Sequence, residues 1–322
     1  RRFRAPDGGD YTANTPHDKL WRGPSGIICN TYNKGRMTFR ECELGGFPDN
    51  GLYAAGTDGQ IRVWRGTYKN SNGANVRVGG PNSEIIGVNV IVDRNWEETV
   101  AQRGIRVEKT SNIDVKDCYV RIAADTPNSH GISVQWDVEQ AYLKGNRIVV
   151  DSPVFNHGVC ISGRTGDVTV YKTEVEHNGP GGTAFYIDGQ GTDDEWAMLA
   201  QVTITGDAGH KWNRAGIYNQ RNNVEFRAVD VTQTGSSKRR ALENFGDNCM
   251  VYECDFTARQ HPLIDTAADT WIENSTFRSA DDRQGIRLTD TTENIYLKRN
   301  RIENDVKDEG CDSLRMVGNT FF

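Results

Sequence analysis

Apolar and polar residues alternate in short runs along most of this chain, and the runs recur at a regular interval. In residues 104–108, Ile and Val alternate with Arg and Glu, which is the period of two expected for a strand with one buried face. Residues 112–120 repeat the alternation after a short turn. Similar pairs of runs begin at Gly131, Gly158 and Gly285, so the repeat is roughly 25 residues long, as in solenoid proteins.

Alignment of the repeats predicts which side chains point inward. One inward column reads Cys42, Val88, Cys118, Asn146, Thr173, Val202, Val229, Cys254, Ser275, Asn300, Asn319. A second, two residues further on, reads Leu44, Val90, Val120, Ile148, Val175, Ile204, Val231, Phe256, Phe277, Ile302, Phe321. Two strands, a bend and a third short strand per repeat describe one coil of a parallel β-helix, with coils about 4.8 Å apart.

The sequence therefore predicts an all-β fold, a right-handed single-stranded parallel β-helix of about 11 to 12 coils. A β-sandwich would also give many short strands, but the fixed repeat argues against it. We expect residues 26–322 to form one β-helix domain. Residues 1–25 lack the repeat, and we expect them to cap the first coil, whose strand edges and core would otherwise be open.

This stacked pattern resembles the pectin-lyase-like superfamily of right-handed β-helix proteins. A closer resemblance, to β-helix proteins encoded by haloarchaea and by some of their viruses, lies in the stretches Gly46–Ala54, Ile61–Val63, Gly66–Asn72, Val76–Gly79 and Glu84–Gly87. The resemblance implies the fold and an exterior location, extracellular, at a cell surface or on a virion.

Charge and composition limit the classes of partner that the protein is expected to bind. The net charge of −6 is spread over the chain, which disfavours nucleic acid as a partner. No apolar run is long enough to span a membrane. The repeat places six of the seven cysteines inward, as small buried apolar residues, and only Cys160 on an outward position. Since no Cys-x-x-Cys pairs occur, a zinc site is not expected.

The outward face of the first strand in each coil is the candidate binding surface, because carbohydrate lies there in β-helix enzymes of the superfamily that the chain resembles. The matching positions are Tyr53, Arg77, Arg106, Ser133, Cys160, Tyr186, Tyr218 and Arg287, followed two residues later by Glu108, Gln135, Ser162, Asp188 and Gln220. Arg77 and Arg106 would clamp a carboxylate of an acidic glycan.

Other members of this face complete the predicted site. Tyr186 and Tyr218 would stack on sugar rings, and Gln135 would add a polar contact. Trp212 belongs to the long insertion 206–214, and long loops on a rigid solenoid often carry binding residues. A face of arginines and tyrosines that is merely solvated remains the alternative.

Two histidines supply candidate chemistry. His130 and His157 each precede a glycine that opens a coil, so they should stack at the rim of the outward face. Their surroundings are similar to the Gly-His-Gly element of polygalacturonases, which also need paired aspartates on the preceding coil; here that coil has only Glu108. A structural histidine pair is the alternative. The candidate acid/base residues are His130, His157, Asp188 and Glu108.

Three functions follow as hypotheses: a glycan-recognising β-helix of the spike or adhesin kind, a lyase or hydrolase acting on an acidic polysaccharide, and a structural assembly subunit. No cofactor is expected, although a bound calcium in the groove would favour the enzyme. Met316, Phe321 and Phe322 close the last repeat with apolar side chains. We therefore expect self-association or a partner protein at that end of the coil stack.

Overall fold

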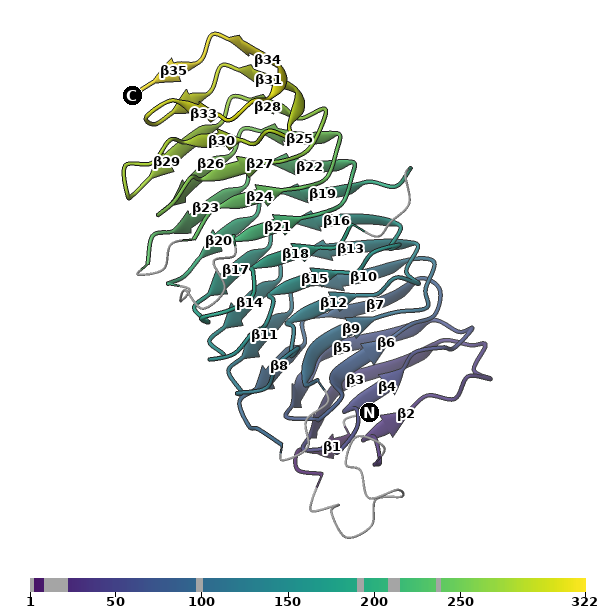
Figure 1. Ribbon diagram of the computed structural model, residues 1–322. Coiled ribbons are helices and arrows are strands. Elements are labelled where there is room, and N and C mark those ends of the chain that lie inside the picture. Colours follow the sequence, from purple (N-terminus) through teal and green to yellow (C-terminus); the bar gives the residue numbers. More distant parts are fainter. Residues whose placement is uncertain (1–2, 9–22, 97–100, 190–193, 208–214, 236–238) are drawn as a thin grey trace.

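The computed structural model describes residues 3–8, 23–96, 101–189, 194–207, 215–235 and 239–322. All regular elements in these residues are β-strands, and they stack as two parallel sheets along one axis from the N-terminal to the C-terminal coils (Figure 1). The chain is thus an all-β parallel β-solenoid, as the sequence predicts. None of the described segments forms a helix that is long and apolar enough to cross a membrane.

The smaller sheet has 12 strands, one from each described coil. Its strands are β2 (Ile27–Ile28), β4 (Leu52–Ala54), β6 (Ala74–Val78), β9 (Arg103–Val107), β12 (Ile132–Val134), β15 (Val159–Ile161), β18 (Phe185–Ile187), β21 (Ile217–Asn219), β24 (Leu242–Asn244), β27 (Leu263–Asp265), β30 (Ile286–Leu288) and β33 (Val306–Asp308). This 12-stranded sheet carries the predicted outward face.

The larger sheet has 23 strands in two limbs. The first limb contains β7 (Ser83–Ile86), β10 (Ile113–Lys116), β13 (Gln140–Lys144), β16 (Asp167–Tyr171), β19 (Ala197–Ala200), β22 (Val224–Arg227), β25 (Cys249–Tyr252), β28 (Trp271–Glu273), β31 (Glu293–Lys298) and β34 (Asp312–Val317). The second contains β8 (Asn89–Val92), β11 (Tyr119–Ile122), β14 (Arg147–Val150), β17 (Glu174–His177), β20 (Thr203–Thr205), β23 (Asp230–Gln233), β26 (Asp255–Ala258), β29 (Thr276–Ser279), β32 (Arg301–Ile302) and β35 (Thr320–Phe321).

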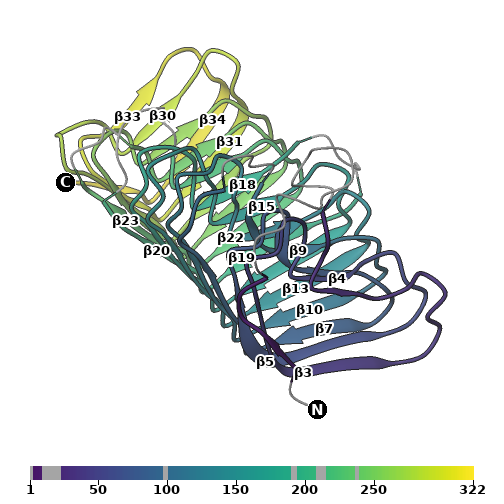
Figure 2. The same cartoon turned by 90° about the horizontal axis from the view of Figure 1, so that it is seen from below.

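The two limbs merge at the N-terminal end. There β3 (Met37–Gly45) and β5 (Ile61–Lys69) are long enough to run through both limbs, and β5 pairs with β7 and with β8. The short strand β1 (Arg4–Ala5) pairs in parallel with β3 and extends the sheet into the predicted N-terminal cap. Figure 2 shows the stack from below, with the first limb (β7, β10, β13) and the second limb (β20, β23) along different sides.

A sharp bend between the limbs recurs in every coil and explains the first inward column. At this bend one residue in each coil has positive φ: Glu41, Arg65, Gly87, Asp117, Gly145, Lys172, Gln201, Ala228, Glu253, Asn274, Arg299 and Gly318. The next residue then points inward, and asparagines at this position bond to backbone: Asn146 Oδ1 accepts from Cys118 N at 3.1 Å, and Asn146 Nδ2 donates to Val115 O at 2.9 Å. These side chains satisfy polar groups that the bend removes from the strand ladder.

The core lies inside the coils and follows the predicted register. Val90, Val120 and Ile148 are direct neighbours on successive strands and are fully buried. The same column continues through Phe256, which packs edge-on against Phe277 at 5.7 Å between ring centroids. Stacking of like on like lets each coil continue the apolar core of the coil before it.

The last described coil differs from the others because its apolar side chains are exposed. Met316, Val317, Phe321 and Phe322 are between 40% and 49% accessible to solvent. An apolar surface of this kind suits a contact with another chain segment or another protein. That such a contact exists stays a prediction.

Candidate functional site

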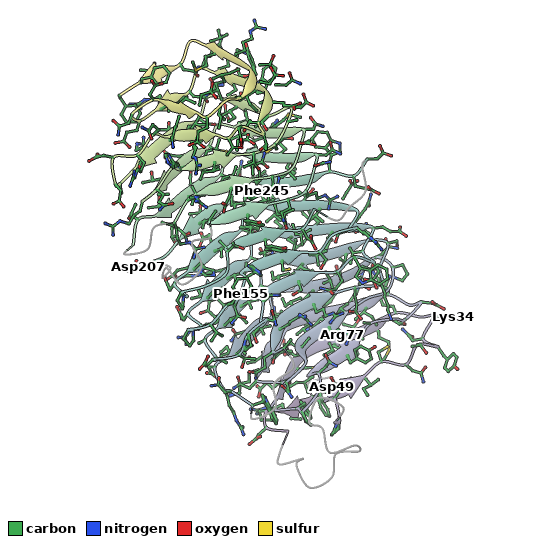
Figure 3. All side chains as sticks on the ribbon, viewed as in Figure 1. Lys34, Asp49, Arg77, Phe155, Asp207 and Phe245 are labelled. Carbon is green, nitrogen blue, oxygen red and sulfur yellow. The ribbon has the colours of Figure 1, made fainter. Side chains whose placement is uncertain are left out.

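The outward side chains of the 12-stranded sheet stand in the predicted register. Tyr53 pairs with Arg77, Arg77 with Arg106, and Arg106 with Ser133 on successive strands. The column continues from Ser133 to Cys160, Tyr186 and Tyr218. Figure 3 labels Asp49, Arg77, Phe155 and Phe245, which follow one another along the stack in that view. The coils thus bring residues far apart in sequence onto one face, although several of them are covered.

A triad of Arg77, Glu108 and Arg106 occupies the N-terminal part of this face. Arg77 Nη2 donates to Glu108 Oε1 at 2.6 Å and Arg77 Nε to the same oxygen at 2.9 Å. Arg106 Nε lies 2.6 Å from Glu108 Oε2, as an ion pair whose alignment falls short of a hydrogen bond. Glu108 is only 2% exposed, and Arg77 also stacks over the ring of Tyr53. The predicted carboxylate clamp therefore already holds a carboxylate from its own chain.

A ladder of rings runs along the next coils. The predicted stacking of the histidines is confirmed: the centroids of His130 and His157 are 4.8 Å apart. His157 stacks in turn on Tyr186 at 4.8 Å, and Tyr186 on Tyr218 at 5.7 Å with an angle of 3° between the rings. Phe245 follows Tyr218 at 5.1 Å. The spacing follows from the distance between coils.

Backbone contacts define the state of the two histidines. The N–H of His157 donates to His130 Nδ1 at 3.2 Å, and the N–H of Thr183 donates to His157 Nδ1 at 3.1 Å. Both Nδ1 atoms therefore act as acceptors, which places the proton of each neutral ring on Nε2. Burial, helped by the positive charge of Arg103, lowers the pKa of His130 to about 3. A pKa this low disfavours His130 as an acid/base group near neutral pH, and its catalytic role stays a prediction.

The ladder also changes the interpretation of the two tyrosines. Tyr186 and Tyr218 are nearly parallel and in contact, so each covers one face of the other. His157 packs on the other side of Tyr186 and Phe245 on the other side of Tyr218, so mainly the ring edges remain for solvent. The hydroxyl of Tyr186 donates to Gln220 Oε1 at 3.1 Å. A sugar that stacks on a ring needs a free face, so this part of the site suits hydrogen bonding better than stacking.

A pocket of about 320 Å³ opens beside the ladder. It is lined by Trp136, Ser162, Gly163, Arg164 and Asp188. Trp136 is 61% exposed and makes no ring contact with another described residue. The turns after β12, β15 and β18 place these residues together, since the N–H groups of Ser162 and Asp188 bond to carbonyls of the preceding coils. The pocket thus offers a free indole next to charged and hydroxyl groups.

The remaining predicted site residues are placed as follows. Asp188 lines the pocket, and Gln135 is half-buried in the turn beside Trp136. Trp212 lies outside the described residues. The sequence analysis missed Trp136 and Arg164; a large aromatic residue directly after an outward position of a polar turn is the signal that could have found Trp136.

Cysteine and metal chemistry gain little support. Cys160 is half-buried, and burial, reinforced by Asp188 and opposed by Arg103, raises the pKa of its thiol to about 12, which disfavours a nucleophile. Cys311, predicted to be inward, is also only partly buried. Among the residues that the structure describes, no three His, Cys, Asp or Glu side chains come together as metal ligands.

Comparison of the chain with family models, with curated proteins and with solved structures gives no match. The resemblance to the pectin-lyase-like superfamily and to haloarchaeal β-helix proteins therefore stays a prediction. The site must be interpreted from its own geometry.

Proposed function

We propose that this protein binds glycans on the outward face of the 12-stranded sheet, with a sugar ring held in the pocket beside Trp136. The observation that carries the proposal is the exposed indole of Trp136 in the same pocket as Ser162, Arg164 and Asp188. An aromatic face covers the apolar side of a sugar, and polar groups around it bond to the hydroxyls. Such a combination is typical of a small-ligand site on a rigid scaffold.

Binding is favoured over cleavage by the placement of the carboxylates. Glycosidic hydrolysis commonly uses two carboxyl groups that flank the bond. Among the described residues that line this pocket, Asp188 is the only carboxylate, whereas Glu108 is buried between two guanidinium groups. His130, with a pKa of about 3, is poorly matched to proton transfer at neutral pH.

The coil architecture supports a role in which the rigid rod presents this face. Parallel coils that contact only their neighbours make a stiff support, which suits a spike, a fibre or an adhesin. On this proposal the protein acts outside a cell or on a virion, and its partner is a polysaccharide or a cell-surface glycan.

A panel of immobilised neutral and acidic polysaccharides tests the proposal. The wild type should be retained on at least one of them, and Trp136→Ala should weaken retention at least tenfold, about 1.4 kcal/mol, because the stacking surface is lost. Trp271→Ala is the matched control, since Trp271 is 44% exposed but lies on β28 in the first limb. Equal retention of wild type and Trp136→Ala would overturn the site. Release of reducing or unsaturated ends by the wild type would favour the lyase or hydrolase instead.

A further inference from the structure

Positive charge exceeds negative charge around the Arg77–Glu108–Arg106 triad. A third arginine, Arg103, begins the strand β9 that also carries Arg106, and it makes no ion pair with any described residue. Burial, together with the like charges of Arg106 and Arg77, lowers the pKa of the Arg103 guanidinium. The three guanidinium groups on this part of the sheet therefore outnumber the carboxylates that act on them, which are Glu108 and, at Arg77, Asp49.

Two buried polar atoms next to this charge have no hydrogen-bond partner, Arg103 Nε and Ser133 Oγ. Arg106 Nε faces Glu108 Oε2 at 2.6 Å as an ion pair but without the alignment of a hydrogen bond. Ser133 is fully buried and lies directly beside Arg106 in the register of β9 and β12. A buried donor without an acceptor is destabilising, so two such donors beside the strained Arg106 contact indicate that an acceptor belongs there.

We propose that Arg103, Arg106 and Ser133 form an oxyanion subsite that binds a carboxylate or sulfate substituent of the glycan. All three groups can donate, and the uncompensated charge favours an anion over a neutral hydroxyl. The inference rests on the proposed function, and it adds the charge class of the glycan to it.

The subsite lies close to the Trp136 pocket in register and in sequence. Ser133 pairs with Cys160 on β15, and Ser162, two residues after Cys160, lines the pocket. Trp136 follows Ser133 by three residues in the turn after β12. A sugar stacked on Trp136 could therefore direct an anionic substituent toward the three donors.

Calorimetric titration with small probes tests the subsite separately from the pocket. The probes are inorganic sulfate, methyl glucuronide, a sulfated methyl glucoside and unmodified methyl glucoside, so that carboxylate and sulfate are distinguished. The wild type should bind at least one anionic probe, and Arg103→Gln should weaken that binding at least tenfold, about 1.4 kcal/mol. Arg103→Lys should retain part of it, because the charge remains while the fork of donors is lost.

Arg287→Gln is the matched control, because Arg287 stands in the same outward column but is paired with Glu309 at 2.8 Å. It should leave anion binding unchanged. If Arg103→Gln does not fold, Ser133→Ala gives the test, since it removes only the unpartnered hydroxyl and should weaken anion binding severalfold.

The outcomes separate the two proposals. The subsite is overturned if the wild type binds no anionic probe, or if every folded variant of Arg103 and Ser133 binds like wild type. Anion binding that depends on Arg103, without retention of any polysaccharide, would support the subsite and contradict the proposed function. Glycan retention that depends on Trp136 but not on Arg103 would support the proposed function and contradict the subsite.

Discussion

Two triads on the same face of the 12-stranded sheet share one geometry but differ in burial. In the N-terminal triad, Arg77 and Arg106 flank Glu108; in the C-terminal triad, Arg287 and Lys307 flank Glu309, with contacts at 2.8 and 2.5 Å. Both glutamates come directly after a strand, and the backbone N–H of each donates to a carbonyl of the preceding coil.

The side chain of Glu108 is 2% exposed, whereas that of Glu309 is 28% exposed. The two cations lower the pKa of Glu309 to about 2, but solvent and salt screen such a pair, so its contribution to stability is small. Around the buried triad solvent screens the same contacts much less, so each uncompensated charge or unpaired donor there lowers the stability of the fold more. The environment of the triad, rather than its residue pattern, therefore makes the N-terminal one a candidate site.

Removal of each carboxylate gives the largest contrast between the triads. Glu108→Gln leaves Arg77, Arg103 and Arg106 without a buried counter-charge and should lower the free energy of unfolding by about 3 to 5 kcal/mol. Glu309→Gln should leave the urea midpoint close to that of the wild type, since its triad is exposed. Urea unfolding followed by circular dichroism measures both. Equal effects of the two changes would contradict the role of burial.

Asp265 shows what burial does to an acid of the same sheet that has no ion-pair partner among the described residues. It lies inside the coils under Asn244, which donates to its Oδ1 at 3.2 Å, while Oδ2 has no partner. Burial raises its pKa from 3.8 to about 6. A folded pKa above the unfolded one means that stability is fully present below about pH 4 and is lost as the pH rises through about 6.

Asp265→Asn should remove this loss of stability and extend the row of hydrogen-bonded amides formed by Asn219 and Asn244. Relative to wild type, the variant should gain on the order of 3 kcal/mol at neutral pH and little at about pH 4. Urea unfolding at several pH values measures the difference, with the exposed Asp58→Asn as a control. A difference that does not change with pH would show that Asp265 is not protonated on folding.

The smallest effect concerns the thiols near each triad. Cys160, beside the N-terminal triad, and Cys311, beside the C-terminal one, are half-buried, with pKa values raised by burial to about 12 and about 11. At about pH 8 both should react with a thiol reagent more slowly than a free cysteine, and Cys311 faster than Cys160. The other five cysteines are buried and should react only in denaturant. Fast labelling of Cys160 would mean that this part of the face is open.

The sequence was sufficient for the fold because the repeat is a local property of strands and bends. Val120 and Ile148 were predicted to stack, and they do, since one coil length fixes the register for all coils. The sequence also placed Arg106 and Ser133 in one outward column. It could not show that Ser133 is covered or that Glu108 is buried, because both depend on which long side chains of neighbouring coils fold over the face.

The sequence could not show the contact between Tyr186 and Tyr218 for a related reason, and their stacking on sugar rings stays a prediction. Column positions say which residues are neighbours, but the angle between two rings depends on their packing, and these two cover each other. Trp136 was missed because it lies in a turn, where the repeat gives no orientation. Prediction from the repeat was therefore reliable for inward positions and weaker for outward ones.

Hydrogen exchange read by mass spectrometry, with and without a glycan retained in the panel, tests the central claim most directly. Glycan binding should protect peptides that cover 130–136 and 158–164 and should leave 306–312, around the C-terminal triad, without added protection. Trp136→Ala should abolish the protection. Protection confined to the first or second limb, or to the C-terminal triad, would contradict a glycan site on this part of the 12-stranded sheet.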